Sequence, residues 1–176
     1  MSDKLPTAED ARKLLRETGC SKAVVDHCKT VARLACDTAI VCKENGLEVD
    51  LRLVEIGALL HDLGRSRTHA VHHAIVGSRI AKAKGVPEAV ISIIKRHVGG
   101  GITAVEAEKL GWPEDTYVPV TLEEKIVSYA DKLIAGSNKA SIEATIANLS
   151  KDKKPEAAER VRRLHKEISS LVGDKR

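Results

Sequence analysis

The chain has 176 residues, which is enough for one domain with a substantial buried core. Its net charge of +4 could help to attract an anionic substrate, but it is too small to indicate a nucleic-acid-binding protein. Because there is no Phe and only one Trp and two Tyr, the core must be built from aliphatic side chains. That composition favours close helix packing over sheets.

The pattern of caps, glycines and apolar residues predicts helices throughout and no strands. In chain order, helices are expected at 8–18, 21–45, 51–63, 68–84, 87–98, 104–110, 122–134, 141–149 and 155–172. Thr103 with Glu106, and Thr121 with Glu124, match the capping box that opens a helix. The sequence therefore predicts an all-α protein with a single domain over residues 1–176.

Aromatic residues are confined to a loop and one helix. The loop at 111–120 separates two predicted helices and carries two of the five prolines. It contains Trp112 and Tyr117, and Tyr129 follows in the next helix, so these three are the aromatic candidates for stacking on a base. The loop could cover a site or pack against the helices, and the sequence leaves both open.

Cysteine usage and hydropathy indicate the compartment. Cys20, Cys28, Cys36 and Cys42 form no Cys-x-x-Cys pair, which argues against a zinc ribbon. Cys28 and Cys36 fall in a periodic apolar stretch and are expected to be small buried residues. The N-terminus has no secretory apolar core, and no stretch reaches the length of a transmembrane helix. We therefore expect a cytoplasmic protein with reduced thiols and no membrane partner.

Several predicted helices place an ionisable side chain on the face that carries their apolar residues. These inward residues are His27, His61, Asp62, His97 and Asp131. A single inward histidine is usually hydrogen-bonded to backbone, but a buried carboxylate costs several kcal/mol unless it is paired. A shared cation explains the whole set, because it attracts the aspartates and accepts the imidazole lone pairs. Ligation by His and Asp without thiolate is typical of Mn, Fe, Co, Ni or Zn.

The order of these residues resembles a known signature. His27, then His61 with Asp62, then Asp131 is similar to the H…HD…D motif of the HD-domain superfamily of metal-dependent phosphohydrolases. The segment LLHDLGR resembles the family's LLHDIGK, with Arg65 in place of the usual lysine. The segment SYADKL resembles the family's final aspartate motif.

The resemblance spans about residues 24–134 and implies an HD-type helical bundle. On this basis the single domain consists of an HD core at 21–136 and a C-terminal helical extension at 137–176.

His73 and His97 resemble the additional histidines of binuclear HD proteins. These include diadenosine-tetraphosphate hydrolases and cyclic-dinucleotide phosphodiesterases. The likeness implies two metal ions bridged by Asp62, one of them bound by His73 and His97. The other ion would be bound by the rest of the signature, namely His27, His61 and Asp131.

The remaining histidines leave alternatives open. His72 and His69 lie close enough in sequence to His73 to take its place as a ligand. His73 itself could instead contact the substrate or support another ligand. His165 lies among charged residues on the last helix and is expected at the surface.

The resemblance also implies the chemistry. Water activated by the metal would cleave a phosphoester or phosphoanhydride bond of a small, nucleotide-like substrate. Asp62 would anchor the metal and could accept a proton. Arg65, just after the helix stop at Gly64, and Arg96, beside His97, are candidates for binding the substrate phosphate.

Two other functions are compatible with the same residues. One is an HD-fold di-iron oxygenase, which uses a similar set of ligands for O₂ chemistry. The other is a non-catalytic ligand-binding or regulatory HD module.

Overall fold

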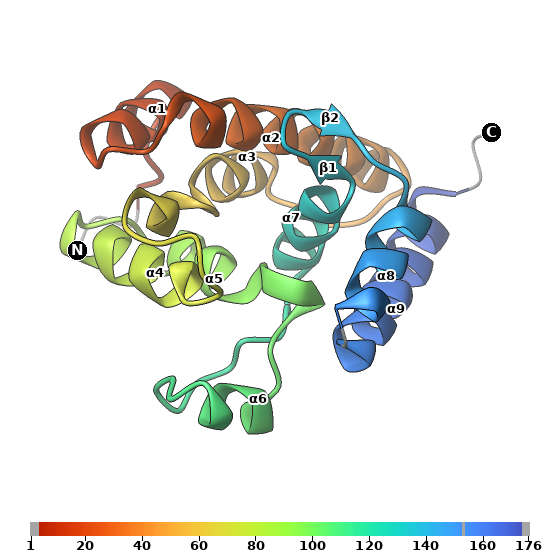
Figure 1. Ribbon diagram of the computed structural model, residues 1–176. Helices are drawn as coiled ribbons and strands as arrows, with labels where there is room; N and C mark the ends of the chain where they lie inside the picture. Colours follow the sequence, from red (N-terminus) through yellow and green to blue (C-terminus); the bar gives the residue numbers. More distant parts are fainter. Residues whose placement is uncertain (1–3, 153, 174–176) are drawn as a thin grey trace.

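The computed structural model describes residues 4–152 and 154–173, and helices dominate it (Figure 1). In chain order the elements are α1 (Ala8–Glu17), α2 (Lys22–Glu44), α3 (Leu51–Leu60), η1 (Leu63–Ser66), α4 (His73–Ala83), α5 (Glu88–Arg96), η2 (Val98–Gly100), α6 (Ala104–Lys109), α7 (Leu122–Lys132), β1 (Ile134–Ala135), β2 (Asn138–Lys139), α8 (Ile142–Lys151) and α9 (Pro155–Val172). The two elements labelled η are short 3₁₀ helices. The predicted all-α fold is confirmed, apart from one short strand pair.

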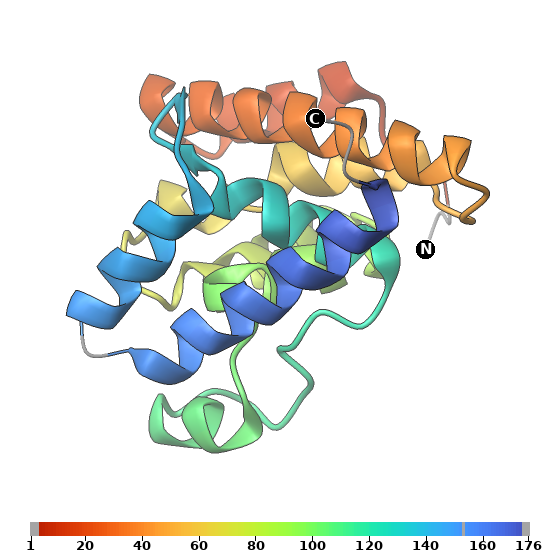
Figure 2. The ribbon, with the colours of Figure 1, turned by 90° about the vertical axis from the view of Figure 1, so that its right-hand side faces the viewer.

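Helix α7 lies at the centre of the bundle. It packs against α2, α3, α5 and α9, and α2 runs along one side of the molecule above α3 and α7 (Figures 1 and 2). The C-terminal pair α8 and α9 packs on the core through α9. Helix α9 carries an apolar stripe, and its members Val161, Leu164 and Ile168 are buried in the main core.

The core is built from aliphatic side chains, as the composition predicts. Among its largest fully buried members are Leu60, Leu63, Ile93, Ile94 and Ile126. Full burial of one such side chain contributes about 1.5–3 kcal/mol to folding. Leu60 and Leu63 flank the His61–Asp62 pair in the sequence, and Ile93 and Ile94 lie in the helix that ends just before His97.

The segment around α6 forms a second, smaller apolar cluster. Trp112 and Tyr117 are buried in it, with their ring centroids 4.9 Å apart, and they pack with Ile75 of α4 and Ile102. The Tyr117 hydroxyl donates a hydrogen bond to the Pro113 carbonyl at 2.8 Å. Of the two alternatives for this loop, the structure shows packing against the bundle.

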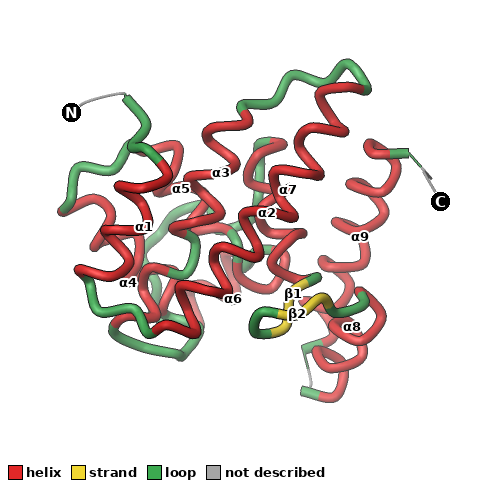
Figure 3. Tube along the Cα trace, turned by 90° about the horizontal axis from the view of Figure 1, so that it is seen from above, coloured by secondary structure: helices red, strands yellow, loops and turns green. Residues whose placement is uncertain are grey.

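The strand pair was not predicted. Ile134 pairs with Lys139 and Ala135 with Asn138 in antiparallel register, and the turn uses Gly136 at φ 62°. Helix α7 therefore ends two residues before its predicted end at Ile134. The hairpin lies beside α2 (Figure 3), so it borders the face on which His27 lies.

Helix α4 begins at His73, and the prediction that it begins near Thr68 is wrong. The preceding turn η1 packs directly against α4. A Cβ atom on Gly64 would lie 1.9 Å from the His73 carbonyl oxygen and 2.6 Å from the Gly77 nitrogen. The two backbones therefore touch at Gly64, and this contact places the start of α4 beside the His61–Asp62 pair.

The predicted capping boxes are confirmed. The Thr103 hydroxyl accepts a hydrogen bond from the Glu106 amide, and the Thr121 hydroxyl accepts one from the Glu124 amide, each at 3.3 Å. Substituting such a cap by alanine typically costs about 1 kcal/mol. These caps define where α6 and α7 begin.

Two expectations from composition can be compared with the structure. Within residues 4–152 and 154–173, no helix combines the length and the hydropathy needed to cross a bilayer. The four cysteines are free thiols; Cys28 and Cys42 are buried, while Cys20 and Cys36 are half-buried. The expected burial of Cys28 is confirmed, and that of Cys36 is only partial.

Candidate metal centre

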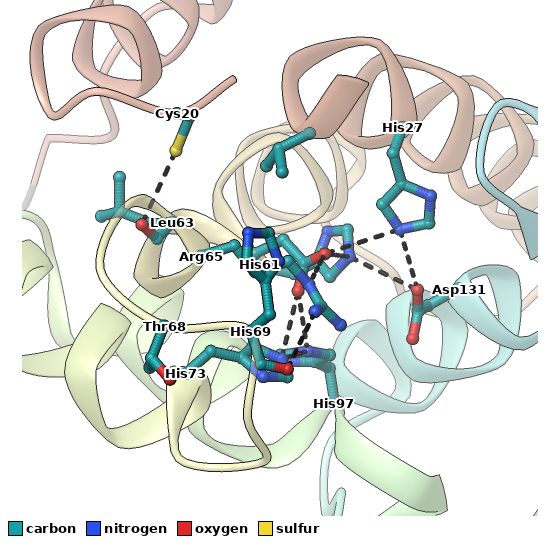
Figure 4. Close-up of polar contacts among 12 residues, drawn as sticks. Cys20, His27, His61, Leu63, Arg65, Thr68, His69, His73, His97 and Asp131 are labelled. Atoms are coloured by element: carbon teal, nitrogen blue, oxygen red, sulfur yellow. Dashed lines mark hydrogen bonds and ion pairs between the residues drawn. The ribbon is translucent and has the colours of Figure 1, made fainter. Parts of the chain in front are cut away.

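Four imidazoles from different elements point toward a common centre (Figure 4). His27 lies in α2, His61 directly follows α3, His73 begins α4, and His97 directly follows α5. Each ring places Nδ1 at hydrogen-bond distance from a backbone carbonyl. These contacts are His27–Gly136 at 2.7 Å, His61–Ala58 at 2.7 Å, His73–Ala70 at 2.8 Å and His97–Ile94 at 2.9 Å.

The carbonyl partners determine the tautomer of these rings. A carbonyl oxygen can only accept a hydrogen bond, so each imidazole carries a proton on Nδ1. In the neutral ring, Nε2 then presents its lone pair to the centre. Metal-binding histidines have this arrangement, since the hydrogen bond from the second nitrogen fixes the orientation of the ring.

Asp62 lies between two pairs of these histidines. Its Oδ1 is 3.1 Å from His73 Nε2 and 3.4 Å from His97 Nε2. Its Oδ2 is 3.7 Å from both His27 Nε2 and His61 Nε2. Each oxygen of the same carboxylate therefore faces a different histidine pair, as a bridging ligand does.

Asp131 joins His27 and His61 as a third potential metal ligand. Its Oδ1 lies 3.1 Å from His27 Nε2 and 3.5 Å from His61 Nε2. The donor atoms of these three residues lie within 4.8 Å of one another, and so do those of a second group, His61, Asp62 and His97. The structure thus brings together all six predicted metal ligands.

Unsatisfied polar atoms show that the centre fits a cation. His73 Nε2 and His97 Nε2 are 3.0 Å apart, and two lone pairs at that distance repel unless a proton or a metal ion lies between them. His61 Nε2 and Asp62 Oδ1 are buried and have no hydrogen-bond partner. Leaving such groups unpaired costs about 1–3 kcal/mol each. Divalent metal ions with nitrogen and oxygen ligands would satisfy all of these atoms.

The electrostatics keep both aspartates ionised. Burial opposes their charge, but the neighbouring His61 holds the pKa of Asp62 well below its usual value. Lys132 and His27 outweigh burial at Asp131 and likewise hold its pKa well below the usual value. Burial lowers the pKa of His97 to about 4, so its Nε2 lone pair is available at neutral pH. At His61 burial favours the neutral form, but the Asp62 charge raises its pKa well above the usual value.

A pocket of about 470 Å³ opens onto one side of the centre. Its lining includes His27, Asp62, Arg65, Asp131 and Lys132. The other ligands lie deeper and are shielded from solvent. A larger groove of about 710 Å³ runs along α9 and contains none of the ligands. A substrate in the 470 Å³ pocket would therefore meet the side of the centre that carries Asp131.

The two predicted phosphate-binding arginines have different surroundings. Arg65 lines the pocket, and its Nε lies 2.5 Å from Asp62 Oδ2. Arg96 lies outside the lining and binds Glu124 Oε1 at 2.6 Å and the Thr116 carbonyl at 3.0 Å. Its guanidinium joins α5 to α7 and the loop before it, so the structure gives the predicted phosphate role of Arg96 no support.

The other histidines have separate positions. His72 Nε2 lies 3.2 Å from the Leu110 carbonyl, and its ring meets Trp112 edge-on, away from Asp62. His69 is exposed and lines the pocket mouth. The prediction that His165 is a surface residue is wrong, because it is half-buried and bonds to the Tyr129 hydroxyl at 2.8 Å.

Some supporting residues were missed by the sequence analysis. Lys132 Nζ contacts Asp131 Oδ2, and Ser128 donates a hydrogen bond to the His97 carbonyl at 3.0 Å. Lys132 could have been found, because a lysine directly after a ligand aspartate can reach its carboxylate. Ser128 gave no such signal, since its partner lies on another helix.

Comparison with known sequences places the chain in a family. A family model described as HD domain matches residues 24–136. An uncharacterized protein of Methanocaldococcus jannaschii is 43% identical over 93% of this chain and 98% of its own length. A tRNA (cytidine(56)-2'-O)-methyltransferase of Thermoplasma volcanium is 41% identical over 96% of this chain but only 48% of its own length. The chain therefore spans about half the length of that curated relative.

A solved structure shares the fold. The HD domain of the L. monocytogenes phosphodiesterase PgpH, in complex with cyclic-di-AMP, gives a TM-score of 0.52 over 92% of this chain and 95% of that chain, with 17% identity. The chain belongs to the HD-domain superfamily, as the resemblance of its sequence predicted. The likeness to its diadenosine-tetraphosphate hydrolase branch stays a prediction.

Proposed function

We propose that the protein is a metal-dependent phosphohydrolase that cleaves a phosphoester or phosphoanhydride bond of a nucleotide-like substrate. The observation that carries this proposal is the position of Asp62, whose two oxygens face two different histidine pairs. Membership of the HD-domain family supports the reaction class. The structurally similar PgpH domain binds cyclic-di-AMP, which supports a nucleotide-like ligand.

The proposed centre contains two divalent transition-metal ions, drawn from Mn, Fe, Co, Ni and Zn. The first would be bound by His27, His61 and Asp131, and the second by the other two imidazoles, with Asp62 shared. When bound, such ions make water a nucleophile at neutral pH and polarise a phosphoryl oxygen.

The protein's own residues position these groups. Nδ1 hydrogen bonds hold the rings in place, so little side-chain entropy remains to be lost on binding. Asp62 anchors the centre from within. Because its pKa is held well below the usual value, it is a poor acceptor for a proton at neutral pH, so anchoring is its better-supported role.

A substrate screen tests the proposal. Metal-stripped protein is reloaded with Mn²⁺ and incubated with nucleotides, cyclic nucleotides, cyclic dinucleotides and dinucleoside polyphosphates, with and without O₂. We expect metal-dependent release of phosphate or of a nucleotide product that is independent of O₂. Turnover that requires O₂ would point to an oxygenase instead. Absence of turnover from the loaded protein against every class would favour a ligand-binding module.

A further inference from the structure

Two cationic side chains at the pocket contact the carboxylates of two predicted metal ligands. Arg65 Nε lies 2.5 Å from Asp62 Oδ2, and Lys132 Nζ contacts Asp131 Oδ2. Both cations line the same pocket, and their side chains are 30% and 15% exposed. Each therefore meets a ligand carboxylate from the substrate side.

Arg65 and Lys132 compensate the negative charge of Asp62 and Asp131, as bound metal ions would also do. A buried carboxylate is stable only when positive charge or hydrogen bonds compensate its desolvation. Metal ions bound to Asp62 and Asp131 would reduce the attraction of these carboxylates for Arg65 and Lys132. A guanidinium has five N–H donors and an ammonium has three, so both side chains retain donors for an anion in the pocket.

Their backbones are held in place. The Lys132 carbonyl accepts a hydrogen bond from the Thr145 hydroxyl at 2.7 Å, which joins the end of α7 to α8. Arg65 lies in the turn η1, which packs against α4. Side chains on fixed supports lose less freedom when they bind a ligand, so the pair is suited to recognition.

We propose that Arg65 and Lys132 act together as a clamp for a dianionic phosphoryl group, so that the site selects a terminal phosphate over a phosphodiester. This inference rests on the proposed hydrolase function. A terminal phosphate carries about two negative charges at neutral pH, whereas a diester carries one. Two cations in one pocket match the former, and both bind phosphate by charge-assisted hydrogen bonds.

Equilibrium binding tests the clamp without relying on turnover. Lys132→Gln and Arg65→Gln are compared with wild type and with Lys139→Gln, which changes an exposed lysine on β2 outside the pocket lining. Calorimetry first measures Mn²⁺ binding, and then binding of inorganic phosphate and of dimethyl phosphate to the Mn²⁺-loaded proteins. We expect full Mn²⁺ loading in every variant. The Kd for phosphate should rise about tenfold in each clamp variant and stay unchanged in Lys139→Gln.

Dimethyl phosphate reports the selectivity. Its Kd should rise much less than that of phosphate, because a monoanion gains less from two cations. An unchanged phosphate Kd in both variants, loss of Mn²⁺ from Lys132→Gln, or equal loss of the two ligands would each overturn the clamp. Turnover with unchanged phosphate binding would contradict the clamp alone. Phosphate binding that weakens as expected, in a protein without turnover, would contradict only the hydrolase proposal.

Discussion

At the scale of single residues, Asp62 is the most constrained group in the site. It is buried, and histidine Nε2 atoms lie close to both of its oxygens. Arg65 also contacts its Oδ2. Removing one charge from such a network leaves the partners buried and uncompensated, which is more costly than the loss of a surface charge.

The conservative variant Asp62→Asn keeps the shape of the side chain but removes its charge. We expect its metal affinity and its metal-dependent turnover to fall by about two orders of magnitude or more, with an unchanged helical circular dichroism spectrum. Asp37→Asn, an exposed change on α2, is the control and should behave as wild type. Near-normal turnover of metal-loaded Asp62→Asn would show that the site has been assigned to the wrong residues.

Metal number can be tested at His73 and His97. Because their Nε2 atoms lie 3.0 Å apart and both face Asp62 Oδ1, they are suited to share an ion distinct from that of His27 and Asp131. Elemental analysis should find about two Mn²⁺ or Fe²⁺ per wild-type chain and about one in the His73→Ala/His97→Ala double variant. One ion in both proteins would leave the two histidines with supporting or substrate-contacting roles.

At the scale of secondary-structure elements, η1 and α4 approach each other backbone to backbone at Gly64. A Cβ atom on Gly64 would meet backbone atoms of His73 and Gly77, which cannot rotate away as a side chain can. The position of His73 relative to the end of α3 therefore depends on a glycine that carries no chemistry.

Gly64→Ala should force η1 and α4 apart. We expect a loss of about 1–3 kcal/mol in the free energy of unfolding, measured by urea denaturation, together with weaker metal binding because His73 moves. Gly85→Ala is the matched control: its Cβ would meet open space, and only its positive φ of 72° is unfavourable. The control should leave metal binding intact, so equal metal loss in both variants would rule out the proposed collision.

The elements also show what the sequence could predict. The capping pairs at Thr103 and Thr121 located two helix starts, because the cap interaction is local and needs only residues three apart. The hairpin was missed because four paired residues are too few to show alternation. That hairpin supplies the Gly136 carbonyl that orients His27, so this partner of His27 could not be predicted either.

For the site residues too, local periodic signals could be read from the sequence and contacts between distant residues could not. His27, His61, His97 and Asp131 were identified from the helix faces they share with apolar residues, which is a periodic signal. The choice between His72 and His73 needed the fold, because neighbouring residues in a turn point in directions that spacing does not determine. Arg96 was assigned to phosphate from its position beside a ligand, but its partner Glu124 lies on another helix.

At the scale of the whole molecule, the site is assembled from side chains of several helices. Buried imidazoles and carboxylates from several helices meet in the interior, and metal ions would compensate them only in the folded chain. Binding to the folded state alone stabilises it, by about 2.7 kcal/mol when the free ligand is at a hundred times its Kd.

Metal removal should therefore lower the melting temperature. We expect treatment with a chelator to reduce Tm by about 5–10 °C and Mn²⁺ to restore it, as followed by circular dichroism. The Asp62→Asn variant should show a much smaller shift, since it holds less metal. An equal shift in wild type and variant would mean that the stabilising metal binds elsewhere.

The ligands are distributed over most of the chain, from His27 in α2 to Asp131 near the end of α7. No segment that ends before residue 131 contains the full set. Within the part of the chain that the structure describes, no helix contributes more than one of the six ligands. On a translating ribosome, the nascent chain would gain its complete site only after α7 had emerged and packed between α2 and α5. Prematurely terminated chains would consequently lack the full site, and a tightly held metal would mark only polypeptides whose synthesis had passed that point.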